Sequence, residues 1–321
     1  MANTICINEN ISTTKHLIQE KPTLVNNPDD KFETILFLPN NPERKAEGGL
    51  RTKGYFKMSY EDKPLISVIT VVFNGETYLE ETIKSVINQS YDNVEYIIID
   101  GGSTDGTLDI IGKYEDKIDY WVSEADGGIY DAMNKGLSLS SGKYIGIINA
   151  DDWYMEEVFQ ESMEALIATQ ADYSFASIQK IPSGLIVRPV YPLENGKVFQ
   201  GMMYPHITAF ISRDIYKNIG LFNTKYKIAA DYDMAQRIHN VGYRAVSVDR
   251  ILAELIEGGA SDTIKSKSEN RDIAISHGKG YFSAYLSYFC YLLKHCIRQF
   301  FPKKTINMIY KLKKSRFQYE A

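Results

Sequence analysis

Two adjacent aspartates, Asp151 and Asp152, are the residues of this 321-residue chain best placed to bind a metal ion. They follow the apolar run 144–148 after a two-residue gap, at the end of a predicted buried strand. Hard carboxylate oxygens at such a place can hold Mg²⁺ or Mn²⁺ beside a diphosphate. The alternative is a local role, in which Asp152 caps a helix that starts near Met155. The two residues alone leave both interpretations open.

Three further acidic residues occupy positions that could contact a substrate. Asp100 follows the apolar run 94–99 and precedes two glycines, so its carboxylate could accept hydrogen bonds from a base or ribose. The alternative for Asp100 is a turn-forming aspartate. Asp231 and Asp233 lie at the start of a predicted helix, where one of them could be an N-terminal cap and Asp233 could pair with Arg237.

Alternating strand-like and helix-like segments from residue 64 onward predict an α/β fold with a doubly wound, mainly parallel sheet flanked by helices. Apolar, β-branched runs typical of buried strands lie at residues 66–72, 94–99, 118–122 and 144–148. Helical segments are predicted between them, at residues 79–87, 105–114 and 130–139. Because ligands bind beyond the carboxyl ends of such strands, the acidic residues fall where this architecture places a site.

The pattern changes after residue 172. Residues 173–178 and 185–190 flank a Pro-Ser-Gly turn and predict a hairpin, and helices are predicted at 213–219, 231–241 and 279–301. Before residue 64 the sequence predicts a loosely structured extension with one or two short strands around residues 32–38. Within that extension, the glycine-rich, basic segment 48–54 could touch a phosphate, and a surface linker is the expected structure.

Composition and missing motifs exclude several classes of protein. The composition, 44% hydrophobic and 24% charged residues, is typical of a globular protein and excludes disordered and collagen-like chains. The sequence has no Gly-x-x-x-x-Gly-Lys phosphate loop, no dinucleotide-binding glycine motif and no Gly-x-Ser-x-Gly elbow. A net charge of −5 does not suit binding to nucleic acid. Three scattered cysteines, with no signal-like N-terminus and no run of about twenty apolar residues, predict a cytoplasmic protein.

The C-terminal segment differs in charge from the rest of the chain. Eight basic and no acidic residues lie between residues 294 and 316: Lys294, Arg298, Lys303, Lys304, Lys311, Lys313, Lys314 and Arg316. The aromatic, apolar stretch 281–293 before them is too short to span a hydrocarbon core, which needs about twenty residues. We therefore expect a peripheral contact with the anionic inner face of the cell membrane, the alternative being a helix that packs on the body.

Six blocks of sequence, in this order, resemble the family 2 glycosyltransferases of the GT-A fold. These inverting enzymes assemble bacterial polysaccharides, of the colanic-acid type among others. The blocks lie at residues 67–74, 78–79 together with 85–90, 99–107, 128–136, 149–152 and 230–233. The resemblance implies a catalytic domain at 64–255, with a nucleotide-binding half at 64–152 and an acceptor-binding half at 153–255. An N-terminal extension, 1–63, and a helical C-terminal segment, 256–321, would flank it.

The resemblance also implies roles for individual residues. The donor site for a nucleotide sugar would be formed by Val72, Phe73, Asn74, Asp100, Asp131 and Asn134. Asp151 would be the ligand of a Mn²⁺ or Mg²⁺ ion, and Asp231 the general base that deprotonates the acceptor hydroxyl. A divalent ion neutralises charge on the departing phosphate, and a positioned carboxylate contributes on the order of 10²–10⁴ in rate.

Three residues depart from the family pattern. Asn149 replaces the first aspartate of the Asp-x-Asp signature, which leaves Asp151 as the main protein ligand and the role of Asp152 open. Ala230 replaces the glutamate before the base. Gly101 replaces a second aspartate, which weakens the expectation that the base is uracil, although a UDP-sugar stays the favoured donor.

Two more residues have competing interpretations. His206 could bind the acceptor or the diphosphate, with a structural hydrogen bond as the alternative. Lys135 lies four residues after Asp131, and a plain helix pair is its expected role.

The predicted function is therefore metal-dependent, inverting transfer of a sugar from a nucleotide sugar to a lipid-linked saccharide acceptor in surface polysaccharide biosynthesis. One alternative, a sugar-nucleotide nucleotidyltransferase, would need a glycine-rich basic loop after the first strand, where residues 73–76 provide none. The other alternative, a non-catalytic, membrane-associated carbohydrate-binding protein, is opposed by the presence of Asp100, Asp151 and Asp231.

Overall fold

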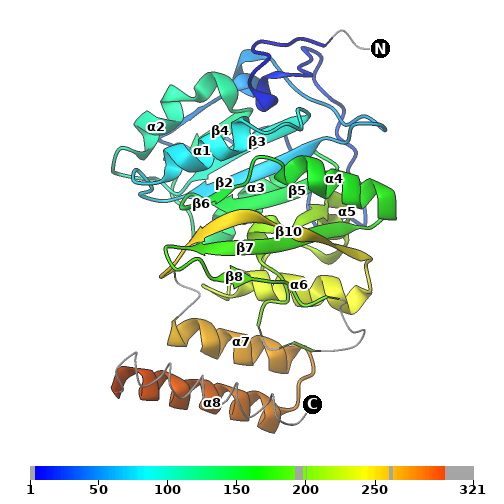
Figure 1. The fold of residues 1–321 in the computed structure, drawn as a ribbon. Helices are drawn as coiled ribbons and strands as arrows, with labels where there is room; N and C mark the ends of the chain where they lie inside the picture. Colours follow the sequence, from blue (N-terminus) through cyan, green and yellow to red (C-terminus); the bar gives the residue numbers. More distant parts are fainter. Residues whose placement is uncertain (1–3, 192–197, 200, 260–262, 301–321) are drawn as a thin grey trace. The chain divides into compact units, whose positions relative to one another are not determined.

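The computed structural model describes residues 4–191, 198–199, 201–259 and 263–300. The chain forms two compact units (Figure 1). The first comprises Met1–Lys197 and Met202–Gly259, and the second comprises Val198–Gly201 and Ala260–Ala321.

A ten-stranded sheet forms the centre of the first unit, in the order β1-β4-β3-β2-β5-β9-β7-β10-β6, with β8 paired to β7. The strands are β1 (Ala46–Gly48), β2 (Ile66–Val72), β3 (Val94–Asp100), β4 (Tyr120–Ser123), β5 (Tyr144–Asn149), β6 (Asp152–Tyr154), β7 (Tyr173–Ile181), β8 (Ile186–Val187), β9 (Phe210–Ser212) and β10 (Ala245–Ile256). Strands β4, β3, β2 and β5 run parallel, which confirms the predicted parallel core. The predicted hairpin is also confirmed, as β7 and β8.

Helices cover both faces of this sheet, with α1 and α4 in front of it and α3 and α5 behind it in Figure 1. The helices of the first unit are α1 (Leu79–Ile87), α2 (Thr107–Lys113), α3 (Ile129–Leu139), α4 (Val158–Thr169), α5 (Arg213–Ile219) and α6 (Ala230–Val241). Short 3₁₀ helices add η1 (Ser12–Thr14), η2 (Leu50–Lys53), η3 (Glu115–Lys117) and η4 (His206–Thr208). Helix α3 approaches β2 closely because Gly136 faces Ile69, where any side-chain carbon would clash.

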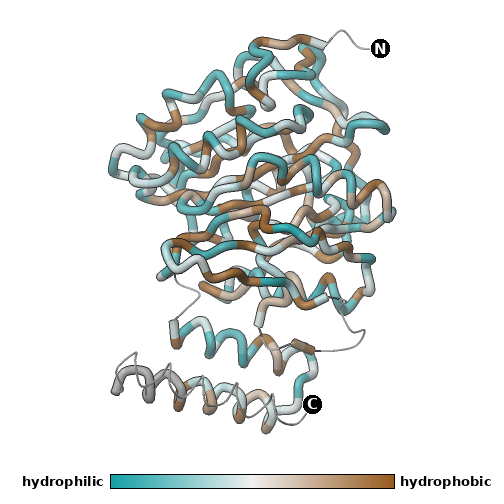
Figure 2. Tube along the Cα trace, in the orientation of Figure 1, coloured by the Kyte–Doolittle hydropathy of each residue, from teal (hydrophilic) through white to brown (hydrophobic). Residues whose placement is uncertain are grey.

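The core lies between the sheet and these helices. Every residue of β2 and β3 is buried, as expected for strands covered on both faces. In the second half of the sheet, the rings of Tyr154, Phe159 and Phe210 pack together with centroid separations of 5.3–6.0 Å. Figure 2 shows how hydropathy alternates along the chain, with hydrophobic segments in the strands and hydrophilic segments in the loops between them.

The N-terminal extension is more ordered than its sequence predicts. The strands expected around residues 32–38 are absent: this segment consists of bends and irregular backbone. Instead β1 pairs antiparallel with β4, where it satisfies backbone groups that an edge strand would leave open. The expected linker at 48–54 is wrong as well: Gly49, with φ of 103°, lies so close to the residues just before β4 that a side-chain carbon would be 2.8 Å from the carbonyls of Ile118 and Asp119.

Buried ion pairs hold this extension in place. The Arg51 guanidinium lies 2.5 Å from the Glu95 carboxylate and donates to the carbonyls of Leu36 and Leu139. The Lys57 ammonium, also fully buried, lies 2.8 Å from Asp119. Burial lowers the pKa of Lys57, and the neighbouring Asp119 opposes that shift. Such pairs are costly to bury but very costly to break, so they fix where the extension lies.

The second unit contains α7 (Ile264–Ser276) and α8 (Tyr281–Phe300). The sequence predicts α8 but not α7, whose polar residues show little helical periodicity. The two helices pack through cation–π contacts, with the Arg271 guanidinium 4.6 Å and 4.8 Å from the ring centres of Tyr285 and Tyr288. Among the described residues, none of the helices combines the length and apolar character needed to cross a membrane.

Six of the basic residues on which the predicted membrane contact depends lie outside the described residues: Lys303, Lys304, Lys311, Lys313, Lys314 and Arg316. Lys294 and Arg298 lie in α8.

Candidate functional site

The carboxyl ends of four parallel strands meet at one edge of the sheet. Val72 at the end of β2 lies opposite Asp100 of β3, and Asp100 lies opposite Ser123 of β4. On the other side of β2, Val71 lies opposite Asn149 of β5. The loops that carry the predicted donor and metal residues therefore begin side by side.

Asp100 organises the loop that follows it. Its carboxylate is fully buried and accepts the backbone N–H groups of Gly102 and Ser103, at 3.1 Å and 3.0 Å. It also accepts the hydroxyls of Ser103 and Ser123, the latter at 2.5 Å. These contacts are those of the turn-forming aspartate that the sequence left open. A direct contact of Asp100 with a nucleoside stays a prediction.

Asn74 joins the loop after β2 to the loop after β3. Its backbone N–H donates to the Ser103 hydroxyl at 2.7 Å, and its side-chain oxygen accepts the N–H of Thr104 at 2.9 Å. Val72 is buried beneath it, whereas the Phe73 ring is 65% exposed. Of the predicted residues in the loop after β2, Phe73 therefore offers an exposed aromatic ring on which a planar ligand could stack.

The two predicted residues of α3 have different surroundings. Asp131 accepts the N–H of Gly127 at 3.0 Å, at the start of the helix. The amide of Asn134 pairs with the backbone of Phe222, donating to its carbonyl at 3.0 Å and accepting its N–H at 2.8 Å. Asn134 thus anchors the segment that leads into α6, and its contact with a donor stays a prediction.

Lys135 is mainly paired with a residue that the sequence did not single out. Its ammonium lies 2.9 Å from the Glu124 carboxylate but 4.0 Å from Asp131, so the expected helix pair is the weaker contact. Glu124 is nearly buried and also contacts Arg44 at 3.0 Å. Burial alone would raise the pKa of Glu124, but hydrogen bonds from Lys135 and Arg44 lower it below its ordinary value.

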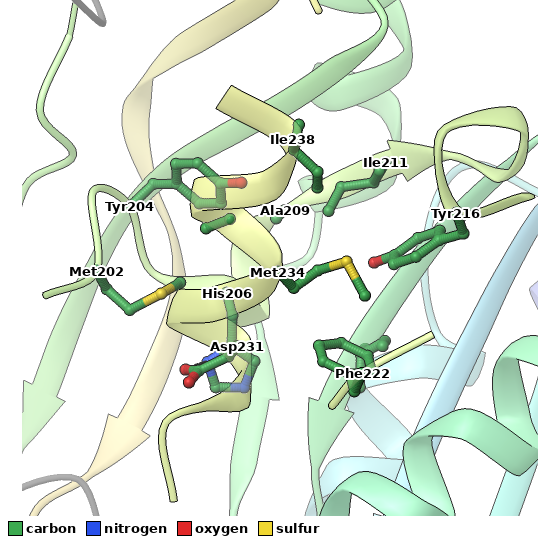
Figure 3. A pocket seen from close by; sticks show the side chains of 12 residues that line it. Met202, Tyr204, His206, Ala209, Ile211, Tyr216, Phe222, Asp231, Met234 and Ile238 are labelled. Atoms are coloured by element: carbon green, nitrogen blue, oxygen red, sulfur yellow. Dashed lines mark ion pairs between the residues drawn. The ribbon is translucent and has the colours of Figure 1, made fainter. Parts of the chain in front are cut away.

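The two oxygens of Asp231 differ in their contacts. Asp231 lies in the first turn of α6, where Oδ1 accepts the Tyr232 N–H at 2.9 Å. The Tyr130 hydroxyl lies 3.1 Å from Oδ1 and 2.7 Å from the Ile228 carbonyl, so its single proton is shared between these two acceptors. Oδ2 faces Nδ1 of His206 at 3.6 Å, beyond hydrogen-bond distance. Figure 3 shows the two side chains next to each other at one end of a pocket. Oδ1 is thereby fixed, and Oδ2 is the oxygen left to accept a proton.

His206 connects the two halves of the site electrostatically. Burial lowers the pKa of its imidazole, while the carboxylates of Asp231 and Asp151 oppose that shift. Both acids are therefore close enough to act on the same ring. Its Nε2 atom is buried with no hydrogen-bond partner among the described residues, so the structural hydrogen bond expected as the alternative is absent there.

Asp151 and Asp152 have opposite environments. Asp151 is exposed. Asp152 is buried in β6, where it accepts the Asn149 amide at 3.2 Å and the Ile256 N–H at 3.3 Å. Burial, together with the charge of Asp151, raises the pKa of Asp152 to about 7. The helix cap suggested for Asp152 is wrong, because α4 begins only at Val158.

A metal ion at this edge would have few protein ligands. Within the described ranges, no three His, Cys, Asp or Glu side chains gather in a way that could enclose an ion. The exposed carboxylate of Asp151 nevertheless fits the hard donor set of Mg²⁺ or Mn²⁺, ions that take one or two carboxylates and complete their shell with water and substrate phosphates.

The pocket beside Asp231 is mostly apolar. Tyr216, Phe222 and Met234 lie on the side away from Asp231 and His206 in Figure 3. The sequence reasoning missed this pocket and the contact between Tyr130 and Asp231. Only the fold brings the start of α3 against the start of α6, and no local sequence signal marks that approach.

Comparisons with known proteins give a consistent result. A model of the family described as "Glycosyl transferase family 2" matches residues 67–220. An uncharacterized glycosyltransferase of Mycobacterium tuberculosis is 32% identical over 180 residues, which cover 54% of this chain and 68% of that protein. The putative teichuronic acid biosynthesis glycosyltransferase TuaG of Bacillus subtilis is 38% identical over 117 residues, which cover 35% of this chain and 46% of TuaG.

Two solved structures share the fold. TarS of S. aureus, residues 1–349 in complex with UDP-GlcNAc, matches with a TM-score of 0.56 and 16% identity, covering 68% of this chain and 69% of that one. The mannosyltransferase PcManGT of Pyrobaculum calidifontis, in complex with GDP-Man and Mn²⁺, matches with a TM-score of 0.55 and 21% identity, covering 70% of each chain.

The surroundings of Glu124 predict a pH-dependent contribution to stability. Because the folded-state pKa of Glu124 is lowered, its stabilising effect is present above its ordinary pKa of 4.5 and is lost as the pH falls through the folded value. We expect Glu124→Gln to lower the free energy of unfolding by about 1–3 kcal/mol at neutral pH, and by less below pH 4.5. Urea unfolding across this pH range measures the difference, with the exposed Glu81→Gln as control. A loss that is the same at all pH values would contradict the assignment.

Proposed function

Because this chain belongs to glycosyltransferase family 2 and is therefore a glycosyltransferase, we propose that it moves a sugar from a nucleotide sugar to a saccharide acceptor with inversion. The UDP-GlcNAc bound by TarS and the GDP-Man bound by PcManGT support a nucleotide-sugar donor. A UDP-sugar is our first candidate. The two alternatives, a nucleotidyltransferase and a non-catalytic binding protein, have no observation in their favour.

The observation that carries this proposal is the environment of Asp231. A base must hold one oxygen toward the acceptor hydroxyl while the rest of the carboxylate stays fixed. The backbone N–H of Tyr232 donates to Oδ1, and the Tyr130 hydroxyl shares its proton between Oδ1 and the Ile228 carbonyl. Oδ2 makes no hydrogen bond to the neighbouring His206. One such base suffices for a single displacement, in which the acceptor oxygen attacks the anomeric carbon from the face opposite the departing diphosphate.

Asp151 is the residue that we propose as ligand of Mn²⁺ or Mg²⁺. When bound, such an ion would offset the negative charge that develops on the departing diphosphate. The Mn²⁺ in the PcManGT complex supports a divalent ion in this fold. Asp152 does not share the role in our proposal, because its oxygens accept hydrogen bonds from Asn149 and Ile256 inside the protein.

The setting that we propose is surface polysaccharide biosynthesis in the cytoplasm, at the inner face of the membrane and on a lipid-linked acceptor. The name of TuaG, a teichuronic acid biosynthesis glycosyltransferase, supports the pathway class. Helix α8 supports the membrane contact: Ala284 is buried, and an exposed apolar stripe is formed by Tyr281, Phe282, Leu286, Phe289 and Leu293. Basic residues follow this stripe in the sequence and would attract anionic lipid headgroups.

Replacing the base should separate binding from turnover. We expect Asp231→Asn to keep the affinity for nucleoside diphosphate and to lose about 10²–10⁴-fold in kcat, because the amide cannot accept the proton. Calorimetry and product analysis measure the two quantities. Asp214→Asn, which changes an exposed acid in the first turn of α5, is the matched control. Equal loss of binding and turnover in Asp231→Asn would point to a structural role instead.

Replacing the proposed metal ligand should affect binding itself. We expect Asp151→Ala to weaken the Mn²⁺-dependent binding of nucleoside diphosphate and to abolish metal-dependent transfer. Without metal, the variant and the parent should bind equally. Calorimetry with UDP and GDP, each with Mn²⁺ or with a chelator, tests this, and the exposed Asp109→Ala on α2 serves as control. Full activity of the variant, or undiminished turnover of the parent in excess chelator, would refute the assignment.

The apolar stripe on α8 should be needed for membrane binding. We expect the parent chain to sediment with vesicles that contain phosphatidylglycerol at low salt, and to be released by high salt. Phe282→Ser combined with Phe289→Ser should reduce this binding several-fold, because both rings are exposed. Ile167→Ser, at an exposed position of α4, is the control. Binding that persists at high salt, or in a chain that ends at Gly280, would contradict the proposal.

A further inference from the structure

The N-terminal segment before β2 follows the outside of the donor half of the sheet. At residues 25–30 this segment contacts Lys217 of α5. The Lys217 ammonium donates to the Val25 carbonyl at 2.7 Å and lies 2.8 Å from the Asp30 carboxylate. The segment then passes the end of α3, where the Ile35 N–H donates to the Ser138 carbonyl at 2.8 Å. The family match covers residues 67–220, so this N-terminal segment lies outside the matched region although its partners Ser138 and Lys217 lie inside it.

At residues 44 and 45 the segment reaches the predicted nucleoside-binding loops. The Lys45 N–H donates to the carbonyl of Ser123 at the end of β4, at 2.8 Å. Its ammonium extends farther and donates to two successive carbonyls of the loop after β3, those of Gly102 at 2.8 Å and Ser103 at 2.9 Å. The preceding Arg44 contacts Glu124 on the other side.

Each of these carbonyls belongs to a peptide group whose N–H is bound by a predicted donor residue. The peptide that carries the Gly102 carbonyl donates its N–H, that of Ser103, to Asp100 at 3.0 Å. The next peptide carries the Ser103 carbonyl and donates the N–H of Thr104 to Asn74 at 2.9 Å. Lys45 therefore binds the carbonyl oxygens of two successive peptide groups, while Asp100 and Asn74 accept hydrogen bonds from the N–H groups of the same two peptides.

This arrangement has an electrostatic as well as a geometric consequence. A cation at the carbonyl end of a peptide polarises it and strengthens its N–H as a donor. The hydrogen bonds that orient Asp100 and Asn74 are thus reinforced from outside by one ammonium group. Lysine suits this position because its ammonium carries three donors, of which two are used here.

We infer that Lys45 is a positioning residue for the nucleoside half of the donor. The N-terminal segment thereby contributes to donor binding, because it supplies the lysine that orients the loop after β3. The inference rests on the proposed function, because it assigns the loop after β3 to the nucleoside. Lys45 acts through the loop and touches neither Asp231 nor the pocket beside it. Its effect is confined to donor affinity, equal for a nucleoside diphosphate and for the matching nucleotide sugar.

The test compares Lys45→Met with the full-length parent. Calorimetry with UDP, GDP, ADP, CDP and dTDP, each with Mn²⁺, identifies the diphosphate that the parent binds. We expect Lys45→Met to raise its Kd about 5- to 30-fold, as loss of hydrogen bonds to a charged group does. Donor KM should rise by the same factor with kcat nearly unchanged. Lys45→Arg should restore most of the affinity, because a guanidinium can also donate to two carbonyls.

Lys53→Met is the matched control, because Lys53 lies in the same segment and its exposed ammonium contacts Glu115 at 3.6 Å, away from these loops. Unchanged Kd in Lys45→Met, or a fall in kcat at constant donor KM, would overturn the inference. A parent chain that binds none of the five diphosphates would instead overturn the proposed function. A loss of thermal stability equal in Lys45→Met and Lys45→Arg, without rescue of affinity, would reduce Lys45 to a structural role.

Discussion

The buried carboxylate of Asp100 organises the loops at the edge of the sheet where the carboxyl ends of the parallel strands meet, which is the proposed donor site. A loop that leaves a parallel strand exposes backbone N–H groups that no neighbouring strand can satisfy. Asp100 accepts two of them and two hydroxyls, and one of these hydroxyls, that of Ser103, accepts the N–H of Asn74. The loops after β2 and β3 are thus one hydrogen-bonded unit. The loop after β2 is also joined to the start of α2, because the Gly75 N–H donates to the Thr107 hydroxyl at 2.9 Å.

The proposed base depends on a second set of contacts, which ties α6 to the donor half. Tyr130 and Asn134, both on α3, bind Asp231 and the backbone of Phe222. Arg237 of α6 donates to the carbonyls of Ile219 and Leu221. It also pairs with Asp233, the contact that the sequence suggested. The helix that carries the base is therefore anchored to the helix that borders the donor site. A displacement of α3 would therefore alter both the proposed donor site and the position of the proposed base.

The regular part of the fold could be predicted from the sequence because it obeys periodicity. The runs that became β2, β3 and β5, and the helices α1 and α3, carry apolar residues at the spacing that their burial requires. The N-terminal segment could not be predicted this way. Single contacts hold it, such as those of Arg51, Lys57 and Lys45 with distant carbonyls and carboxylates, and no local pattern encodes them. Asp151 and Asp152 are alike in sequence, and only the pairing of β6 with β10 makes one exposed and the other buried.

In the proposed reaction Asp231 alone acts as base in a single displacement. The most direct measurement is the anomeric configuration of the transferred sugar, determined by NMR of the first product formed from a donor of known configuration. A single displacement inverts the anomeric centre, so we expect a configuration opposite to that of the donor. Retention of the donor configuration would require two displacements or a different mechanism and would rule out Asp231 as the lone base of a single displacement.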